Sequence, residues 1–432
     1  MPSEGSPIDD TDVRGLKYFK RLLPLFARLH EVGCQRDSAS NRTLHFDEYC
    51  TLVMLYLFNP LIDSVRVLQH ASGLPSAKKL GLSRFSLGSF SEAPGIFEPD
   101  RLKEIIHELA AGARPLPLHP RLADLKHALT LADGTVLEAL PRLTRAICAG
   151  THLQKLRDGR DLHAFRLHIQ LDLRTFQAIG MDRTGGHTVG DSRENAVLRR
   201  SLEPDRCYVA DGAYSTRTLL EEIIDKGSSF VMRVREECAH EVIEERELTS
   251  QDRAAGIIRD VLVKLGHRNE QMKHPVRLIM LEVTPHIRRT RKGVRPYNGV
   301  TSTAYVGQRL CDRLQIVTSL TDLPADLVAL IYRQRYSIEL FIRLFKHLLG
   351  MRHLLSRRPA GVDIQVYCAV IACLLINLQT GRKPDKRMME TVGWYLMGLM
   401  GEQQASDELN QPDNRGVKLR AKAELWKKLG VN

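Results

Sequence analysis

Residues 207–235 read CYVADGAYSTRTLLEEIIDKGSSFVMRVR, and this stretch decides which fold the chain is expected to adopt. It opens with a short apolar run that stops at an Asp-Gly pair and closes with a second apolar run, as buried strands do. Between them, apolar positions recur at helical spacing, with Ser215 as the expected N-cap and Gly227 just past the expected end. The stretch therefore predicts a strand, a helix and a second strand.

The segment upstream of this unit reads mainly as strands. Residues 164–173 alternate apolar and polar side chains, and residues 176–182 follow after two residues, which predicts a hairpin. An earlier apolar run, residues 129–135 (LTLADGT), predicts a strand that stops at Asp-Gly, and residues 194–202 predict a helix. Three strands, helix, strand, helix, strand is an order that indicates an α/β fold with a mixed sheet.

The chain of 432 residues is long enough for two or three structural units. Apolar residues recur at helical spacing from about residue 15 to residue 112, and Pro115, Pro117 and Pro120 then mark a boundary. Strand-like patterns return at about residues 236–321. The expected regions are a helical N-terminal region at 1–120, an α/β domain at 121–380 and a helical C-terminal tail at 381–432.

The charge of the chain suggests a class of partner. Lys and Arg number 63 against 51 Asp and Glu, which gives a formal net charge of +12 and a pI near 9.4. The densest basic run is IRRTRKGVRPY at residues 287–297. A surplus of this size suits a polyanion, of which nucleic acid is the commonest, although solubility alone would also explain it.

Cysteine usage and apolar segments indicate a cytoplasmic setting. The eight cysteines are scattered without a CxxC pair, which predicts a reduced protein with neither a disulfide framework nor a structural zinc. Cys238 and His240 could begin a metal site, but no second pair follows at suitable spacing. The N-terminus holds no apolar signal, and residues 364–378 fall short of the roughly 20 residues that a membrane span needs. We expect a buried helix there and no membrane association.

Residues 332–346 read YRQRYSIELFIRLFK and combine an apolar stripe with a polar column. On a helix that turns by about 100° per residue, Tyr332, Arg335, Glu339 and Lys346 fall within about 60° of one another, with Arg343 beside them. A solvated Arg–Glu pair four residues apart would explain two of these positions. It would not explain why a tyrosine and several cations align with one carboxylate.

A phosphodiester-binding site explains the whole column. The carboxylate of Glu339 would hold a divalent metal ion, while Tyr332, Arg335 and Lys346 would contact the phosphates on either side. One carboxylate is too few ligands for hard cations, so further oxygen ligands must converge from elsewhere in the chain.

Two aspartates after apolar runs are the candidates for those ligands. Asp133 and Asp211 each end an expected strand, which places both at the edge of the sheet. With Glu339 they would form one metal site. Each Asp-Gly pair taken alone is also consistent with an ordinary turn, and Asp172 and Asp182 lie near strand ends as well.

The spacing Y-x2-R-x3-E-x6-K resembles the signature of the bacterial DDE transposases of insertion sequence family four. The matching residues are Tyr332, Arg335, Glu339 and Lys346. Asp133 in LADGT matches the first catalytic aspartate of that family, and Asp211 in DGAY matches the second. Residues 89–102 also resemble a segment that often precedes the catalytic domain, and the resemblance covers roughly residues 45–380.

The resemblance implies a fold and partners. The fold is a ribonuclease-H-like mixed-sheet core in which the first and fourth strands are neighbours, so that Asp133 lies beside Asp211 and a late helix brings Glu339 to them. Residues from about 236 to 321 would be a β-strand insertion whose basic run meets transposon-end DNA. The implied partners are double-stranded DNA, at the element's ends and at the target, and a second copy of the chain in a homodimer.

The implied chemistry is phosphoryl transfer with two Mg²⁺ ions, for which Mn²⁺ usually substitutes. Excision in well-known relatives passes through a DNA hairpin, with a tryptophan of the insertion stacked on a flipped base. The only tryptophans here, Trp394 and Trp426, follow the Glu339 helix. Tyr297 or Tyr305 could stack instead, since any flat ring can do so. The hairpin step therefore stays open.

Three functions remain to be weighed. The first is a transposase that cuts and joins paired DNA ends. The second is a metal-dependent, structure-specific nuclease on the same core, which would need neither inserted strands nor paired ends. The third is a DNA-binding protein without catalysis, which would not require the three carboxylates and the basic column that are all present.

Overall fold

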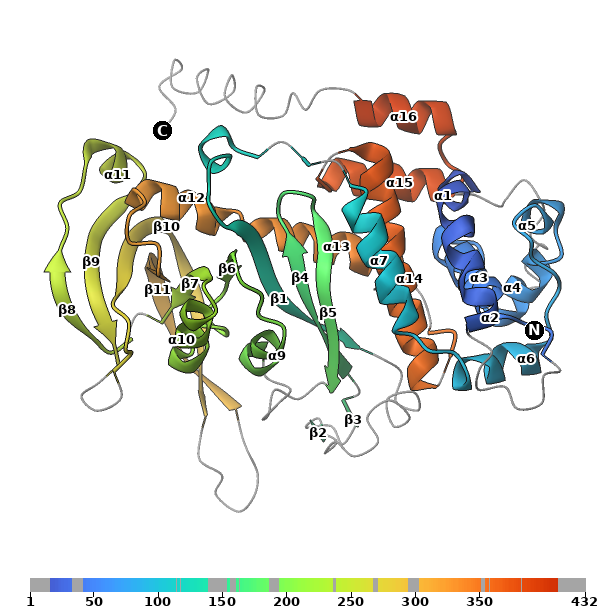
Figure 1. Ribbon diagram of the computed structural model, residues 1–432, viewed down its shortest axis with the longest axis horizontal. Coiled ribbons are helices and arrows are strands. Elements are labelled where there is room, and N and C mark those ends of the chain that lie inside the picture. The colour runs from blue at the N-terminus through green and yellow to red at the C-terminus, as the bar shows by residue number, and fades with distance from the viewer. Residues whose placement is uncertain are drawn as a thin grey trace. The chain divides into compact units, whose positions relative to one another are not determined.

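The computed structural model describes residues 16–32, 42–113, 115–116, 118–138, 154–155, 161–162, 164–185, 194–235, 238–266, 271–293, 303–350, 354–356, 358–381 and 383–410. These residues cluster into two compact units (Figure 1). The first unit comprises Met1–Glu98, His347–Leu355 and Pro384–Asn432, and the second comprises Pro99–Lys346 and Ser356–Lys383.

The first unit is helical, as the apolar spacing predicted. Its helices are α1 (Leu16–Ala27), α2 (Leu29–Val32), α3 (Phe46–Phe58), α4 (Val65–Ala71), α5 (Pro75–Lys78), α6 (Leu87–Glu92), α15 (Lys386–Leu396) and α16 (Glu402–Asn410), with a 3₁₀ turn at Ala93–Gly95. Helix α3 is buried along almost its whole length. The rings of Phe46 and Phe97 stack on each other at 4.6 Å, as do those of Tyr49 and Phe90, so aromatic packing holds α3 in place.

The second unit is built on a nine-stranded mixed sheet in the order β5-β4-β1-β6-β7-β11-β10-β9-β8. Its strands are β1 (Ala128–Glu138), β4 (Ala164–Asp172), β5 (Gln177–Gly185), β6 (Arg206–Ala210), β7 (Ser229–Val234), β8 (His240–Glu245), β9 (Ile257–Leu265), β10 (Val276–Gly293) and β11 (Thr303–Thr318). A separate pair joins β2 (Gln154–Lys155) to β3 (Asp161–Leu162).

Helices cover both faces of this sheet. They are α7 (Arg101–Ala111), α9 (Glu194–Arg200), α10 (Arg217–Asp225), α11 (Ser250–Ala254), α12 (Ala325–Arg333), α13 (Tyr336–Gly350) and α14 (Pro359–Thr380), with a 3₁₀ turn at Pro120–Leu122. Figure 1 shows α12 and α13 crossing one face and α9 and α10 lying on the other. The predicted α/β order of hairpin, helix, strand, helix and strand is confirmed.

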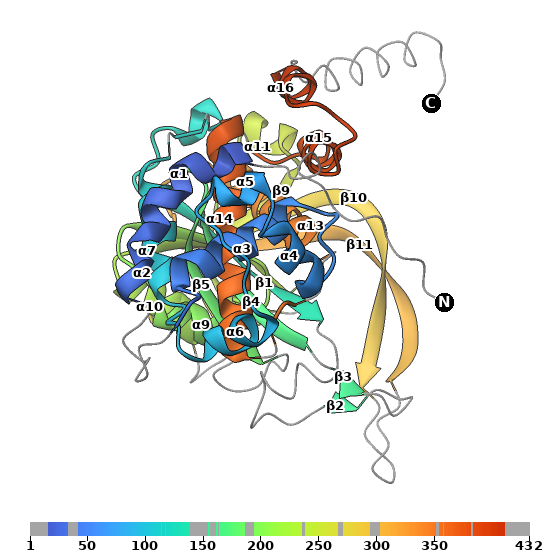
Figure 2. The same ribbon diagram turned by 90° about the vertical axis from the view of Figure 1, so that its right-hand side faces the viewer.

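The strands within residues 236–321 continue the same sheet beyond β7. Strand β11 pairs with β7 in antiparallel fashion, and β10, β9 and β8 follow outward. Figure 2 shows the β10–β11 ribbon extending past the rest of the sheet. The first part of the basic run at 287–297 lies on the end of β10. The rest of the run, including Tyr297, lies outside the described residues.

The parallel register of three strands places charged residues in one row. Leu131 of β1 pairs with Val209 of β6, and Val209 pairs with Val231 of β7. Because side chains alternate between faces, the residue two positions further along each strand points to the same face. Those residues are Asp133, Asp211 and Arg233. The predicted adjacency of the first and fourth strands is confirmed, since β1 is hydrogen-bonded to β6.

Two local predictions were wrong. Asp133 does not end its strand, because β4 continues to pair with β1 past this point, with Asp133 opposite Ile169 and Gly134 opposite His168. Ser215 is not an N-cap, since its hydroxyl donates to the carbonyl oxygen of Gly212 at 3.0 Å and the helix begins two residues later. The predicted helix end is confirmed: Gly227 lies just past α10 with a φ of +74°, which favours glycine.

Residues 332–346, which the sequence predicts to lie on one helix, belong to two helices. Helix α12 ends at Arg333 and α13 begins at Tyr336. Between them the backbone forms hydrogen bonds that span three residues instead of the four of an α-helix. The N–H of Arg335 donates to Tyr332 O at 3.0 Å, and the N–H of Ile338 donates to Arg335 O at 3.1 Å. The sequence could not show this break, because the apolar stripe runs through it without a Gly or Pro.

The apolar segment at 364–378 lies in α14, which is buried as predicted. Within the described residues, α14 is the one helix long and apolar enough to cross a membrane, with a mean hydropathy of 1.9, but 89% of that window is buried inside the protein. This burial is what a core helix requires.

A buried ion pair anchors the start of α12. Arg277 on β10 is 2% exposed and donates from Nε to Asp260 on β9 at 3.1 Å. Its Nη1 also donates to the carbonyl oxygens of Leu320 and Thr321, just before α12. The guanidinium therefore joins the outer strands to the segment that enters the helix.

We predict that Arg277→Ala lowers the free energy of unfolding by about 3 to 5 kcal/mol, because it leaves Asp260 buried and unpaired. The control is Arg259→Ala on β9, whose partner Glu245 is exposed, and this change should have little effect. Urea denaturation of both variants measures the difference. Equal midpoints for the two would contradict the anchoring role.

Candidate active site

Asp133, within β1, and Asp211, just past the parallel strand β6, are held by local backbone hydrogen bonds. Asp133 Oδ1 accepts from the N–H of Gly134 at 2.8 Å. Asp211 follows the last residue of β6, and its Oδ1 accepts from the N–H of Ala213 at 2.9 Å. The N–H of Tyr214 donates to the carbonyl oxygen of Asp211 at 3.2 Å, so the DGAY segment closes as a turn. Both carboxylates are thus oriented by local backbone.

Glu339 reaches the same place from α13. It lies in the first turn of that helix, where the helix dipole favours a negative charge. Arg335 joins it to the sheet: its Nη2 donates to Glu339, and its Nη1 lies 4.0 Å from Asp133 Oδ2. One guanidinium therefore lies near both Glu339 and Asp133, which are far apart in the chain.

The pKa of Asp133 reflects the charged groups around it. This pKa is raised to about 6, mainly by burial and also by the charges of Asp211 and Glu339, against the opposing effects of the Gly134 N–H and Arg335. Two other carboxylates thus act on Asp133 in a partly desolvated place. Such a cluster favours a bound cation.

Tyr332 and Arg233 lie beside the carboxylates. Tyr332, in the last turn of α12, is largely buried and hydrogen-bonds to Arg335. Burial raises the pKa of its hydroxyl, while the charges of Arg335 and Arg233 lower it. In the described part of the chain Arg233 forms no salt bridge, so it is a cation without an acidic partner near the row of aspartates.

Lys346 lies on α13 seven residues after Glu339, about 10 Å along the helix and on the same side. It is exposed, as is Arg343. Neither forms a salt bridge with another described residue. Of the predicted column, Arg335 therefore interacts with both Tyr332 and Glu339, whereas Lys346 extends the column outward.

The donor set fits a hard divalent cation. Three carboxylates supply oxygen ligands, which Mg²⁺ and Mn²⁺ prefer. Within the described ranges, no three His, Cys, Asp or Glu side chains lie close enough to coordinate one ion as they stand. The guanidinium of Arg335 is paired with Glu339 and also lies 4.0 Å from Asp133.

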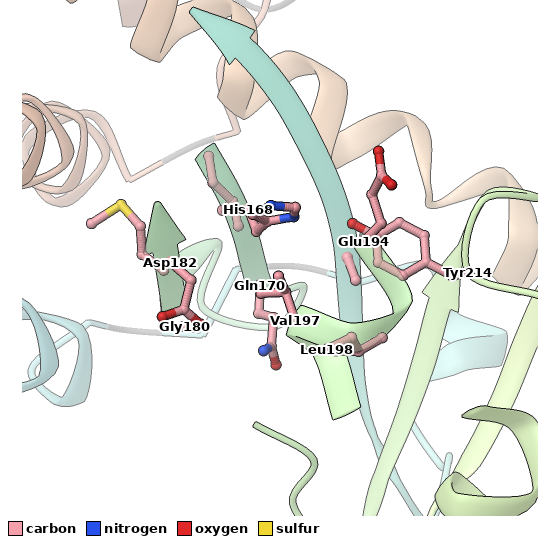
Figure 3. Close-up of a pocket in the computed structure, with 11 residues that line it drawn as sticks. His168, Gln170, Gly180, Asp182, Glu194, Val197, Leu198 and Tyr214 are labelled. Carbon is pink, nitrogen blue, oxygen red and sulfur yellow. The ribbon is translucent and has the colours of Figure 1, made fainter. Parts of the chain in front are cut away.

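A small cavity lies behind the row, on the opposite face of β1 (Figure 3). His168, Gln170, Glu194 and Tyr214 line it, and its volume of about 10 Å³ leaves room for about one water molecule. Burial lowers the pKa of His168 to about 4, so its ring is neutral at pH 7. The cavity is too small for a nucleotide and is part of the packing behind the site.

Sequence reasoning missed Arg233, Tyr214 and the Arg166–Glu194 ion pair. Glu194 accepts from Arg166, and the charge of Glu194 acts on Tyr214 together with those of Asp133 and Asp211. Arg233 could have been found from the sequence. It follows Val231 of β7 by two residues, just as Asp211 follows Val209 of β6 by two residues, and the two valines are paired. The ion pair could not have been found, because it joins separate elements.

Comparison with known proteins identifies the family of the chain. The family described as "Transposase DDE domain" matches residues 125–375, more than half of the chain. The chain belongs to this family and is an enzyme of the DDE transposase class.

Among solved structures, the chain is similar to "piggyBac transposase synaptic complex with hairpin DNA". The identity is 10% and the TM-score 0.40, with 93% of this chain and 83% of that chain covered. A search of curated proteins gives no match.

We predict that Asp133→Asn stabilises the metal-free protein at high pH. The pKa of Asp133 is about 6 in the folded protein and 3.8 in a model peptide, so ionisation costs folding energy above pH 6 and almost none below pH 3.8. The variant should gain about 1 to 3 kcal/mol at pH 8 and much less at pH 4. Urea denaturation in chelator at both pH values measures this.

Asp182→Asn on β5 is the control, since that carboxylate lies outside the cluster. This substitution should not give the gain in stability at pH 8 that is expected of Asp133→Asn. Loss of stability in Asp133→Asn at pH 8 would contradict the crowding of carboxylates.

Proposed function

We propose that the chain catalyses cut-and-paste transposition of an insertion sequence of family four, with Asp133, Asp211 and Glu339 as the catalytic metal ligands. The observation that supports this most is that Glu339, on helix α13, lies near the two aspartates at the adjacent parallel strands β1 and β6. Crowding three carboxylates costs stability, and phosphoryl transfer on DNA is a function that requires such a cluster of metal ligands.

The side chains around the carboxylates would bind the DNA backbone. Arg335, Tyr332 and Lys346 would hold phosphates on either side of the scissile bond, because a guanidinium fork and a phenol both donate to phosphate oxygens. Arg233 would add a further contact, since its charge acts on Tyr332 and it forms no salt bridge with another described residue. Two Mg²⁺ ions, or Mn²⁺ in their place, would activate the attacking water or 3′-hydroxyl and stabilise the leaving oxygen.

The fold of the core would be ribonuclease-H-like, with β8 to β11 as the family's β-strand insertion. The helical N-terminal region at 1–120 would bind the terminal inverted repeats, and a homodimer would hold two ends together on double-stranded DNA in the cytoplasm. The region at 381–432 would be a helical C-terminal tail.

A structure-specific nuclease on the same core is the second candidate, because the carboxylates and phosphate contacts would serve it equally. The two differ in whether cleaved ends are joined to a target. Incubating the protein with Mg²⁺, the inverted repeats that flank its gene and a plasmid decides between them: joined products support transposition, and cuts without joining support the nuclease.

We predict that Asp133→Asn, Asp211→Asn and Glu339→Gln each reduce cleavage by about 100-fold or more, because each removes a group that acts on the transition state. Binding to the ends should stay within a few-fold of the unmodified protein. Gel-based cleavage and filter binding provide the two measurements. Asp182→Asn is the control, and retained cleavage in Glu339→Gln would exclude that residue as a ligand.

We predict that Arg233→Ala weakens binding to DNA of any sequence and makes the salt dependence shallower, by about one unit of slope in log K against log [salt]. Arg259→Ala, which removes an Arg already paired with Glu245, should leave the slope unchanged. Titrations at several salt concentrations test both. An unchanged slope for Arg233→Ala would remove it from the DNA interface.

A further inference from the structure

The guanidinium of Arg335 stands where a metal ion would have to bind. It donates to Glu339 and lies 4.0 Å from Asp133, so it connects two of the three proposed ligands. The side chain is 23% exposed, as is that of Asp133, so solvent screens the pair only in part. The turn between α12 and α13 fixes the backbone of Arg335 through hydrogen bonds on both its N–H and its carbonyl oxygen.

A guanidinium in this position competes with a divalent ion. An ion such as Mg²⁺ binds carboxylate oxygens at about 2.0–2.1 Å, and on Glu339 it would compete for an oxygen that accepts an N–H group of Arg335. Two positive charges between Asp133 and Glu339 would also repel each other. Arg335 in its present position and a metal ion between Asp133 and Glu339 therefore disfavour each other.

DNA offers Arg335 a second partner. A phosphate presents the same paired oxygens as a carboxylate, and arginine binds both in bidentate fashion. Tyr332, which hydrogen-bonds to Arg335, and Arg233 stand next to it and would hold the same phosphate. A phosphate drawn to these three groups would move the guanidinium away from Asp133 and Glu339.

We propose that Arg335 is an exchangeable occupant of the metal site, which holds Asp133 and Glu339 in the DNA-free protein and transfers to a phosphate when DNA binds. This inference rests on the proposed function and adds the order of events at that site. Metal and DNA then bind with positive coupling, and by linkage each raises the affinity for the other by the same factor. Cutting is thereby restricted to a protein already on DNA.

The test measures Mn²⁺ binding by electron paramagnetic resonance, with and without a pre-cleaved duplex of the flanking inverted repeat. In the unmodified protein the duplex should lower the Kd for Mn²⁺ by about 10-fold or more. Arg335→Gln should bind Mn²⁺ at least about 5-fold more tightly without DNA, and the duplex should then improve binding by less than about 2-fold. Arg333→Gln, an exposed neighbour at the end of α12, should behave as the unmodified protein.

Two outcomes would overturn the proposal. One is that Arg335→Gln binds Mn²⁺ no more tightly than the unmodified protein in the absence of DNA; the other is that its coupling to DNA is undiminished. If the Gln variant does not fold, Arg335→Lys takes its place. This variant keeps the positive charge without the guanidinium fork, and its coupling to DNA should be intermediate. Asp133→Asn and Glu339→Gln must lose Mn²⁺ binding in the same assay. If they retain it, the proposed function fails rather than the exchange.

Discussion

The parallel register of β1, β6 and β7 is the constraint on which the proposed site depends. It aligns Leu131, Val209 and Val231 across three strands, and the next residues on that face are Asp133, Asp211 and Arg233. Mutual repulsion of the carboxylates opposes this alignment, and burial of apolar side chains on the other face holds it. Tyr208, Leu219 and Phe230 are among the fully buried residues of that core.

The strands at residues 236–321 support the site as well as extending the sheet. Strand β11 pairs with β7, with Ile316 opposite Arg233. Arg277 on β10 binds the segment that leads into α12, and Arg121 binds Asp326 within α12 at 2.6 Å. The position of Tyr332 and Arg335 therefore depends on strands that a minimal α/β core would not contain.

Arg335 unites the stability and the proposed function of this site. In the protein without DNA it offsets part of the negative charge on Asp133 and Glu339, which a folded core would otherwise carry at a cost. The same guanidinium is matched in shape to a phosphate. In our proposal, one side chain thus stabilises the carboxylates and competes with the ion that they would hold.

The sequence by itself determined the element order and the buried character of α14, because apolar spacing and residue type are local properties. It did not determine that β1 continues through Asp133, since that depends on pairing with β4. The break before α13 and the row that includes Arg233 depend likewise on contacts between distant segments. Only the folded chain decides these, because backbone pairing and desolvation arise between residues that are far apart in sequence.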